Sequence, residues 1–302
     1  CCQLIFLPCY AQGTNKNGHQ LGVAHSTMWV ALIYLVALNL RPAITSVGSL
    51  LPQLGSELQL SETAQGLLGS IPLLAFAVIS PLVYRFSGRL GMERAIIIAL
   101  TVLATGSVIR SYLGLGGLWL GTLLIGCAIG VGNVLVPAIV KRDFSNNVSR
   151  ATGAYSACIT VGAAIASAAA VPLTATIGWQ GALVIWGLPV IIVGLLWIPR
   201  LKSATVVATT TTVKRTPVSR QSTAWLVTAF MGLQSINFYF LVTWLPTIET
   251  QHGISEQQAG WHLFLFQVLG FIGALLIPKL MTNPRHYTPA CLVASIPRFG
   301  GH

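Results

Sequence analysis

Two stretches of the chain, LPQLGSELQLSETAQG at residues 51–66 and LPTIETQHGISEQQAG at residues 245–260, share the pattern that decides the fold. A Leu-Pro pair, an aliphatic residue followed by Ser-Glu, and a final Gly recur at one offset of 194 residues. Ser-Glu is typical of a helix start, because serine caps free backbone N–H groups and glutamate complements the positive helix end. Two unrelated helix starts are one explanation. Six matched positions without a gap favour the other, an internal duplication.

Each stretch joins two long apolar segments in a chain of 302 residues that is 54% hydrophobic and only 8% charged. Soluble domains carry about 25% charged residues, so the composition argues against a soluble enzyme or a nucleic-acid-binding protein despite the net charge of +11. A transmembrane helix needs about 20 mostly apolar residues, and backbone groups in hydrocarbon must bond internally. We therefore predict an all-α membrane protein with eight spans, at about 28–51, 65–84, 95–112, 118–140, 151–174, 179–199, 223–246 and 258–280.

Basic residues are distributed unevenly over the connections between these spans. The N-terminal segment, the 2–3, 4–5 and 6–7 connections and the C-terminal tail hold 15 of the 17 Lys and Arg, and the other connections hold none. Because cytoplasmic loops carry the excess of Lys and Arg, we predict that both termini are cytoplasmic. The other two cations, Arg41 and Arg110, fall within spans, and we expect Arg110 to extend to the outer surface.

The duplication divides the chain into unequal parts. Residues 28–200 are predicted to form a six-helix half, 201–222 a cytoplasmic linker, and 223–280 the first two helices of a second half. A complete second half would end near residue 393, so we expect four further helices to be missing. Residues 1–27 and 281–302 fit neither half, and we interpret them as a non-native or disordered extension and an aberrant tail.

Several motifs together resemble the cyanate and nitroimidazole transporter branch of the major facilitator superfamily. They are LNLRPAIT at 38–45, GNVLVP at 132–137, KRDF at 141–144, Phe238-Tyr239 and Trp244-Leu245-Pro246, and the resemblance covers about residues 28–280. It implies a major facilitator fold built from parallel six-helix halves, here cut short at its C-terminal end. It also implies a bacterial inner membrane location and secondary transport of a small solute by alternating access.

Residues 88–94, GRLGMER, resemble the superfamily signature between the second and third helices. The resemblance implies a gating loop of Gly88, Arg89, Gly91 and Arg94, in which Gly91 permits a tight turn and the two arginines dock on helix ends. The chain departs from the signature at Gly88, where an acidic residue is usual, and this puts the familiar gating ion pair in doubt. The fifth span also lacks the Gly-Pro antiporter signature, which disfavours proton-driven export.

Arg41 is the strongest candidate for binding a solute. It falls near the middle of the first span, where a cation costs roughly 2.5–3.5 kcal/mol, and no Asp or Glu lies well inside any span. Its planar guanidinium suits an anion, while Pro42 removes a helical hydrogen bond and frees nearby carbonyl groups. Two interpretations stay open: Arg41 contacts the solute, or it only satisfies those carbonyls and polar neighbours.

Uncharged polar side chains complete the predicted binding site, because amide and hydroxyl groups suit a small polar solute that must also leave. They are Asn39, Asn133, Gln234, Asn237, Tyr239 and Gln267. Asn133 lies on a helical face with Gly126 and Gly130, so an interhelical hydrogen bond is as consistent with its position as a cavity-lining role. His262 is the best titratable candidate if protons are coupled.

The predicted protein is a monomeric secondary transporter of a cyanate-like or nitroimidazole-like solute, surrounded by membrane lipid, with proton coupling left open. We expect no cofactor, no metal site and no nucleic-acid partner. The alternative is an inert or assembly-only membrane fragment from a disrupted transporter reading frame. A membrane enzyme would need buried acids or histidines, and the spans lack them.

Overall fold

The computed structural model describes residues 27–144, 148–203 and 222–280, and this part of the chain is helical apart from short connections. Most of the predicted extension at 1–27, most of the linker at 201–222 and the whole tail at 281–302 lie outside the described residues. The α-helices are α2 (Thr27–Asn39), α3 (Pro42–Glu57), α4 (Glu62–Leu90), α5 (Met92–Tyr112), α6 (Gly114–Asp143), α7 (Val148–Val184), α8 (Gly187–Trp197), α9 (Ser222–Gln251) and α10 (Glu256–Leu280). A 3-10 helix, η2 (Ile198–Ser203), follows α8.

All eight predicted spans are helical in the structure. The first consists of α2 and α3 together, and the fifth and sixth are separated by a break inside α7 at Gly178, whose φ of 72° favours glycine. Within the described residues, five stretches are long and apolar enough to cross a membrane, and the fifth, of 51 residues, contains both the fifth and sixth predicted spans. The seventh and eighth spans correspond to α9 and α10, of 30 and 25 residues.

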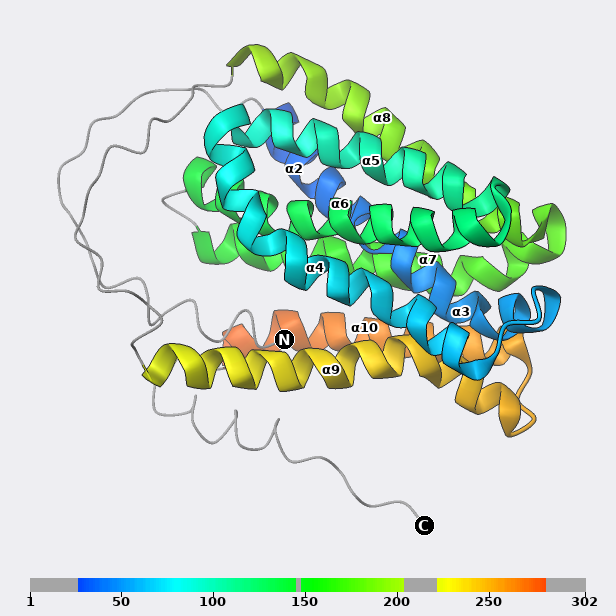
Figure 1. The fold of residues 1–302 in the computed structure, drawn as a ribbon. Helices are drawn as coiled ribbons and strands as arrows, with labels where there is room; N and C mark the ends of the chain where they lie inside the picture. The colour runs from blue at the N-terminus through cyan, green and yellow to red at the C-terminus, as the bar shows by residue number, and fades with distance from the viewer. Residues whose placement is uncertain (1–26, 145–147, 204–221, 281–302) are drawn as a thin grey trace, which may run out of the picture.

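Helices α2 to α8 form one bundle, and α9 and α10 lie side by side along one face of it (Figure 1). Helix α9 packs mainly on α3, and α10 packs mainly on α7. We call the end with the α3–α4 and α9–α10 connections the acidic end, because it carries Glu57, Glu62, Glu249 and Glu256. The opposite end is the basic end, and it carries Arg85, Arg89, Arg94, Lys141, Arg142 and Arg200.

The internal duplication is visible in the helix boundaries. Helices α3 and α9 end at Glu57 and Gln251, which are 194 residues apart, and α4 and α10 begin at the glutamates of the two Ser-Glu pairs. The hydroxyl oxygens of Ser61 and Ser255 accept hydrogen bonds from backbone N–H groups three residues further on, at 3.3 and 3.4 Å. The same local chemistry therefore begins a helix at both copies of the pattern.

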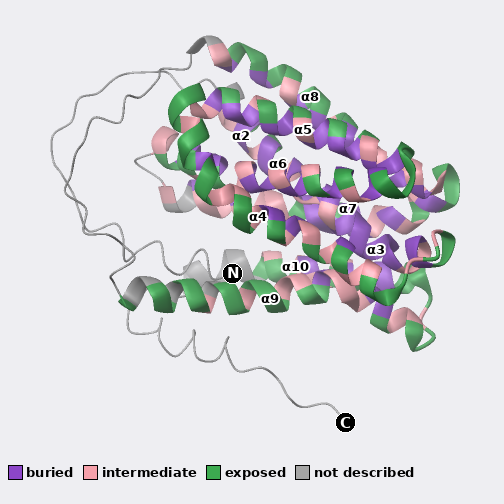
Figure 2. Cartoon of the chain, in the orientation of Figure 1, coloured by how far each residue is buried: buried purple, intermediate pink, exposed green. Residues whose placement is uncertain are grey.

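The surface of the described helices is largely apolar. Figure 2 shows buried residues concentrated inside the bundle, whereas α4 and α9 carry many exposed ones. Those exposed positions include large aliphatic side chains such as Leu74, Val78, Leu226 and Leu233. An apolar surface of this extent is typical of helices that face lipid rather than water.

A glycine allows α7 to cross closely over α2 beside the break in the first span. A Cβ atom at Gly162 would lie 2.1 Å from the carbonyl oxygen of Leu38. That carbonyl is the one that Pro42, which has no N–H, leaves without its helical hydrogen bond. The close contact therefore depends on the absence of a side chain at residue 162.

Replacing Gly162 by alanine is expected to lower the free energy of unfolding by about 1–3 kcal/mol, because two helix backbones must separate. The thermal unfolding midpoint in detergent measures the effect. Gly116→Ala is the matched control, since no atom of the described residues lies within 4 Å of the place that a Cβ atom would occupy at this residue of α6. Equal midpoints for the two variants would contradict the close packing of α7 on α2.

Candidate functional site

Arg41 lies at a break in the first membrane-spanning stretch. Helix α2 ends at Asn39 and α3 begins at Pro42, which occupies the first turn of the new helix. The break follows from the proline, which cannot continue the hydrogen-bond ladder of α2. Arg41 is half-buried and falls near the middle of the 29-residue stretch Trp29–Glu57, as the sequence predicts.

Two aromatic rings lie next to the guanidinium of Arg41. Its central carbon is 5.2 Å from the ring centroids of both Phe238 and Tyr239 on α9, a distance typical of cation–π contacts. Tyr239 meets Phe76 of α4 edge-on at 6.4 Å, and Phe238 meets Phe266 of α10 at 6.1 Å. We call these five residues the Arg41 cluster, and it joins the α2–α8 bundle to both α9 and α10.

The guanidinium of Arg41 has unused hydrogen-bonding capacity. Its Nε is buried and has no hydrogen-bond partner, and Arg41 is absent from the ion pairs formed among the described residues. Tyr155 of α7, only 4% exposed, lies within electrostatic range of both Arg41 and Tyr239. A buried N–H without a partner is costly, so this geometry is suited to an anion or to another strong acceptor.

Among the predicted site residues, Tyr239 lies in direct contact with Arg41. The amide of Asn39 instead donates to the carbonyl oxygen of Leu35, 2.8 Å away in its own helix. Gln267 of α10 is 2% exposed, and its Nε2 has no partner. Gln267 therefore has the same unused donor capacity as Arg41, but no hydrogen bond joins the two residues.

The other three predicted residues are less buried. Asn237 lies on an exposed part of α9, and Gln234 is half-buried on the same helix. Asn133 of α6 is also half-buried and follows Gly132, whose backbone packs against the side chain of Leu40. The structure therefore places Asn133 near the helix break without a direct contact to Arg41.

Sequence reasoning missed the other aromatic residues in and beside the Arg41 cluster. Phe238 belongs to one of the motifs that carry the family resemblance, but sequence reasoning assigned it no role in binding. Nothing in the sequence pointed to Phe76, Tyr155 or Phe266. A pair of adjacent aromatic residues in a polar stretch of α9, near Gln234, was the one available hint.

The basic end contains a network of ion pairs that the sequence did not predict, which we call the ion cluster. Arg142 contacts Glu93 at 2.6 Å and Asp143 at 2.7 Å, and Arg200 pairs with Asp143 and lies 4.0 Å from Glu93. Glu93 and Arg200 are 3% and 6% exposed. The ion cluster therefore ties together α5, α6 and η2 in a poorly solvated position.

The predicted gating loop lies next to this network. Gly91 has a φ of 85°, in agreement with the tight turn expected between α4 and α5. Gly88, Arg89 and Arg94 are exposed, so the charged residue of this loop that is packed into the protein is Glu93. The expected docking role of the arginines stays a prediction.

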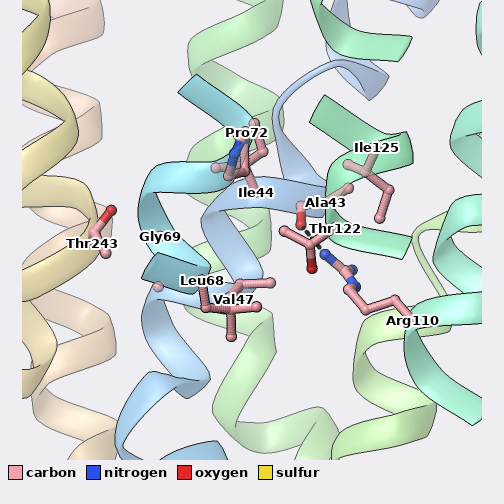
Figure 3. Close-up of a pocket in the computed structure, with 11 residues that line it drawn as sticks. Ala43, Ile44, Val47, Leu68, Gly69, Pro72, Arg110, Thr122, Ile125 and Thr243 are labelled. Carbon is pink, nitrogen blue, oxygen red and sulfur yellow. Dashed lines mark hydrogen bonds between the residues drawn. The ribbon is translucent and has the colours of Figure 1, made fainter. Parts of the chain in front are cut away.

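The prediction that Arg110 extends to the outer surface is wrong. Arg110 is 1% exposed, and it donates hydrogen bonds to the carbonyl oxygens of Ala43 at 2.7 Å and Leu183 at 3.5 Å. Gly121 of α6 makes the burial possible, because a Cβ there would lie 2.5 Å from the backbone nitrogen of Arg110. A small cavity lies beside the guanidinium (Figure 3).

His262 of α10 pairs with Glu249 of α9 at the acidic end. The imidazole Nδ1 is 3.0 Å from both carboxylate oxygens, and the side chain of His262 is 47% exposed. Within the described residues, no three His, Cys, Asp or Glu side chains are grouped so that they could hold a metal ion.

Comparisons with known proteins agree with this architecture. The sequence model of the Major Facilitator Superfamily matches residues 21–297. The chain is 40% identical to the 2-nitroimidazole transporter of Escherichia coli (strain K12) over 255 residues, which cover 83% of this chain and 65% of that protein. It is 29% identical to the cyanate transport protein CynX of the same organism over 253 residues, covering 82% and 65%.

Two further similarities complete the comparison. The uncharacterized transporter YycB of Bacillus subtilis (strain 168) is 38% identical over 250 residues, 82% of this chain and 62% of that protein. The crystal structure of the D-xylose-proton symporter superposes with a TM-score of 0.66 at 14% identity, covering 83% of this chain and 67% of that one, and shows a shared fold. The chain spans less than two thirds of the length of the curated relatives. It belongs to the Major Facilitator Superfamily of membrane transporters, in the branch that its sequence motifs resemble.

Proposed function

We propose that this chain binds a small anionic or polar solute at the Arg41 cluster, as a monomeric part of a transporter that works by alternating access. The observation that carries the proposal is the guanidinium of Arg41, which has a buried Nε without a partner and faces two aromatic rings of α9. A cation held at a helix break, between two groups of helices, can attract an anion without binding it irreversibly.

The chemistry of the Arg41 cluster indicates a class of solute. Two relatives are named for 2-nitroimidazole and for cyanate, which are small molecules with electron-rich oxygen atoms. A guanidinium fork can donate two parallel hydrogen bonds to a nitro group, and the rings of Phe238 and Tyr239 offer flat surfaces for a heterocycle. We therefore infer a planar nitro-substituted heterocycle or a small linear anion as the solute.

The contact between the two groups of helices supports alternating access. Towards the acidic end from the Arg41 cluster, Cβ atoms built at Gly48, Gly66 and Gly69 would lie 2.6, 3.3 and 2.5 Å from atoms of Val242, Trp244 and Thr243 on α9. We call these six residues the glycine junction, and its close packing corresponds to a state that is shut at the acidic end. Because the cations gather at the other end, we assign the acidic end to the outer side of the membrane.

The Gly48→Ala substitution is expected to open the glycine junction, because the new Cβ would lie 2.6 Å from the backbone carbonyl oxygen of Val242. Spin labels at the exposed residues Glu57 and Gln251, in a background without other cysteines, report the separation of the two helix ends. Double electron–electron resonance should show a population at longer distance.

Gly232→Ala on α9 is the control, since in the part of the chain that the structure describes nothing lies within 4 Å of a Cβ atom there. If both variants gave the distance distribution of the unsubstituted chain, the glycine junction would not control opening.

Reconstitution of the whole chain in liposomes tests transport itself. Vesicles preloaded with unlabelled 2-nitroimidazole should accumulate the labelled compound by exchange, and cyanate in the outer solution should compete. Solute binding without exchange would contradict transport by this chain and favour the alternative of an inert or assembly-only fragment.

A further inference from the structure

The cavity beside Arg110 lies outside the Arg41 cluster, where α3, α4, α5, α6 and α9 approach one another. Its lining is mainly apolar, with Val47, Leu68, Pro72 and Ile125 among the side chains, and Arg110 is the only charged residue among the described residues that line it. The cavity has room for about one water molecule. Figure 3 shows the guanidinium of Arg110 reaching towards Ala43 and Thr122 at one side of this space.

Arg110 carries a charge that no described acidic side chain balances. It is 1% exposed and is absent from the ion pairs formed among the described residues. Two of its N–H groups donate to the carbonyl oxygens of Ala43 and Leu183, but its Nε is buried and has no partner. Carbonyl dipoles reduce the cost of burying a cation, yet they leave its net charge in place.

We propose that this cavity is a second anion site, which takes a single chloride ion against the guanidinium of Arg110 when the lining side chains move slightly outwards to admit an ion larger than water. An anion there would neutralise the buried charge and accept the unused Nε–H. The small volume excludes nitrate-sized or heterocyclic anions, so the ligand differs in class from the solute of the Arg41 cluster. The inference does not rest on the proposed function, because Arg41 and Arg110 are separate cations in separate surroundings.

The position of the cavity gives the anion a structural consequence. Its lining includes Gly48 of α3 and Gly69 of α4, and also Thr243 of α9, all of which belong to the glycine junction. The cavity is therefore complete only when α9 is seated on α3 and α4. An anion that binds the complete cavity more tightly than the open one must shift the population towards the closed junction.

Chloride binding to the whole chain in lipid nanodiscs tests the proposal. Chloride is titrated against gluconate at constant ionic strength, and the 35Cl nuclear magnetic resonance line width is followed. The unsubstituted chain should show saturable broadening above that of empty nanodiscs. Arg110→Gln should remove this broadening, whereas Arg85→Gln, which removes an exposed cation at the basic end, should retain it.

A second variant guards against the case in which Arg110→Gln fails to fold. Val47→Leu keeps Arg110 and adds a methylene group to the cavity lining, so it should also abolish the broadening while circular dichroism shows a helical protein. The proposal is overturned if the unsubstituted chain gives no saturable broadening, which would mean a cavity that holds water or nothing. It is equally overturned if the broadening survives in folded Val47→Leu, or if Arg85→Gln abolishes it.

Discussion

Replacing Arg41 by glutamine should weaken the binding of 2-nitroimidazole and of cyanate to the chain by about 100-fold, equivalent to about 2.7 kcal/mol. Glutamine keeps hydrogen-bonding groups but removes the charge and the planar fork that the aromatic rings of α9 hold in place. Losing one partner of a buried charged hydrogen bond typically weakens the binding free energy by about 2–5 kcal/mol. The expected change of about 2.7 kcal/mol lies within this range. Equilibrium dialysis of labelled solute against the chain in nanodiscs gives the dissociation constants.

Two further substitutions sharpen the test of Arg41. Arg41→Lys keeps the positive charge without the fork, so an intermediate loss of affinity would show that both properties matter. Arg89→Gln removes a cation that is exposed at the basic end, and it should leave binding unchanged. If Arg41→Gln bound the solutes as tightly as the unsubstituted chain, or if Arg89→Gln lost as much affinity, the assignment of Arg41 as the residue that binds the anion would be wrong.

The largest expected effect on stability comes from Asp143→Asn in the ion cluster. The substitution leaves Arg200, which is 6% exposed, without its directly paired carboxylate, and Glu93 lies 4.0 Å away. Removing one partner of a buried ion pair typically lowers the free energy of unfolding by about 3–5 kcal/mol, because the remaining charge stays desolvated. Unfolding in a titration of detergent mixtures, followed by circular dichroism, measures the loss.

Glu57→Gln provides the matched control, because Glu57 is an exposed carboxylate at the acidic end and its contact with Gln53 is a surface hydrogen bond. It should change stability by less than about 0.5 kcal/mol. In the double variant Asp143→Asn with Arg200→Gln, part of the loss should be recovered, since the unpaired cation is also removed. Equal effects of Asp143→Asn and Glu57→Gln would mean that the ion cluster does not stabilise the basic end.

Local chemistry explains why the spans could be predicted from the sequence. Pro42 ends α2, Ser61 caps α4 and Gly178 breaks α7, and each of these effects depends on a few neighbouring residues. The apolar length of each segment then identifies it as membrane-spanning. The repeat also predicts that two distant helices end at equivalent positions, and α3 and α9 do end at Glu57 and Gln251, one repeat apart.

The surroundings of the charged residues could not be predicted in the same way. Arg110 donates to carbonyl groups 67 and 73 residues distant in the chain, and Arg200 pairs with Asp143 across 57 residues. Such partners are decided by which helices pack together. Sequence reasoning therefore identified Arg41 as unusual but expected Arg110 to reach the outer surface and gave no indication that Arg200 is buried.

The helix break at Arg41 also has a mechanical consequence. Helix α3 contains 16 residues and is therefore about 24 Å long, and it runs from the break to Glu57. At the other end of the first span, the carbonyl oxygen of Trp29 accepts a hydrogen bond from Arg200, which holds α2 to the ion cluster. If α3 turned about Arg41 while α2 stayed anchored, a rotation of about 10° would move the far end of α3 by about 4 Å. Under the proposed function, the solute binds at this pivot, so that a small displacement there becomes a larger one at the far end of α3.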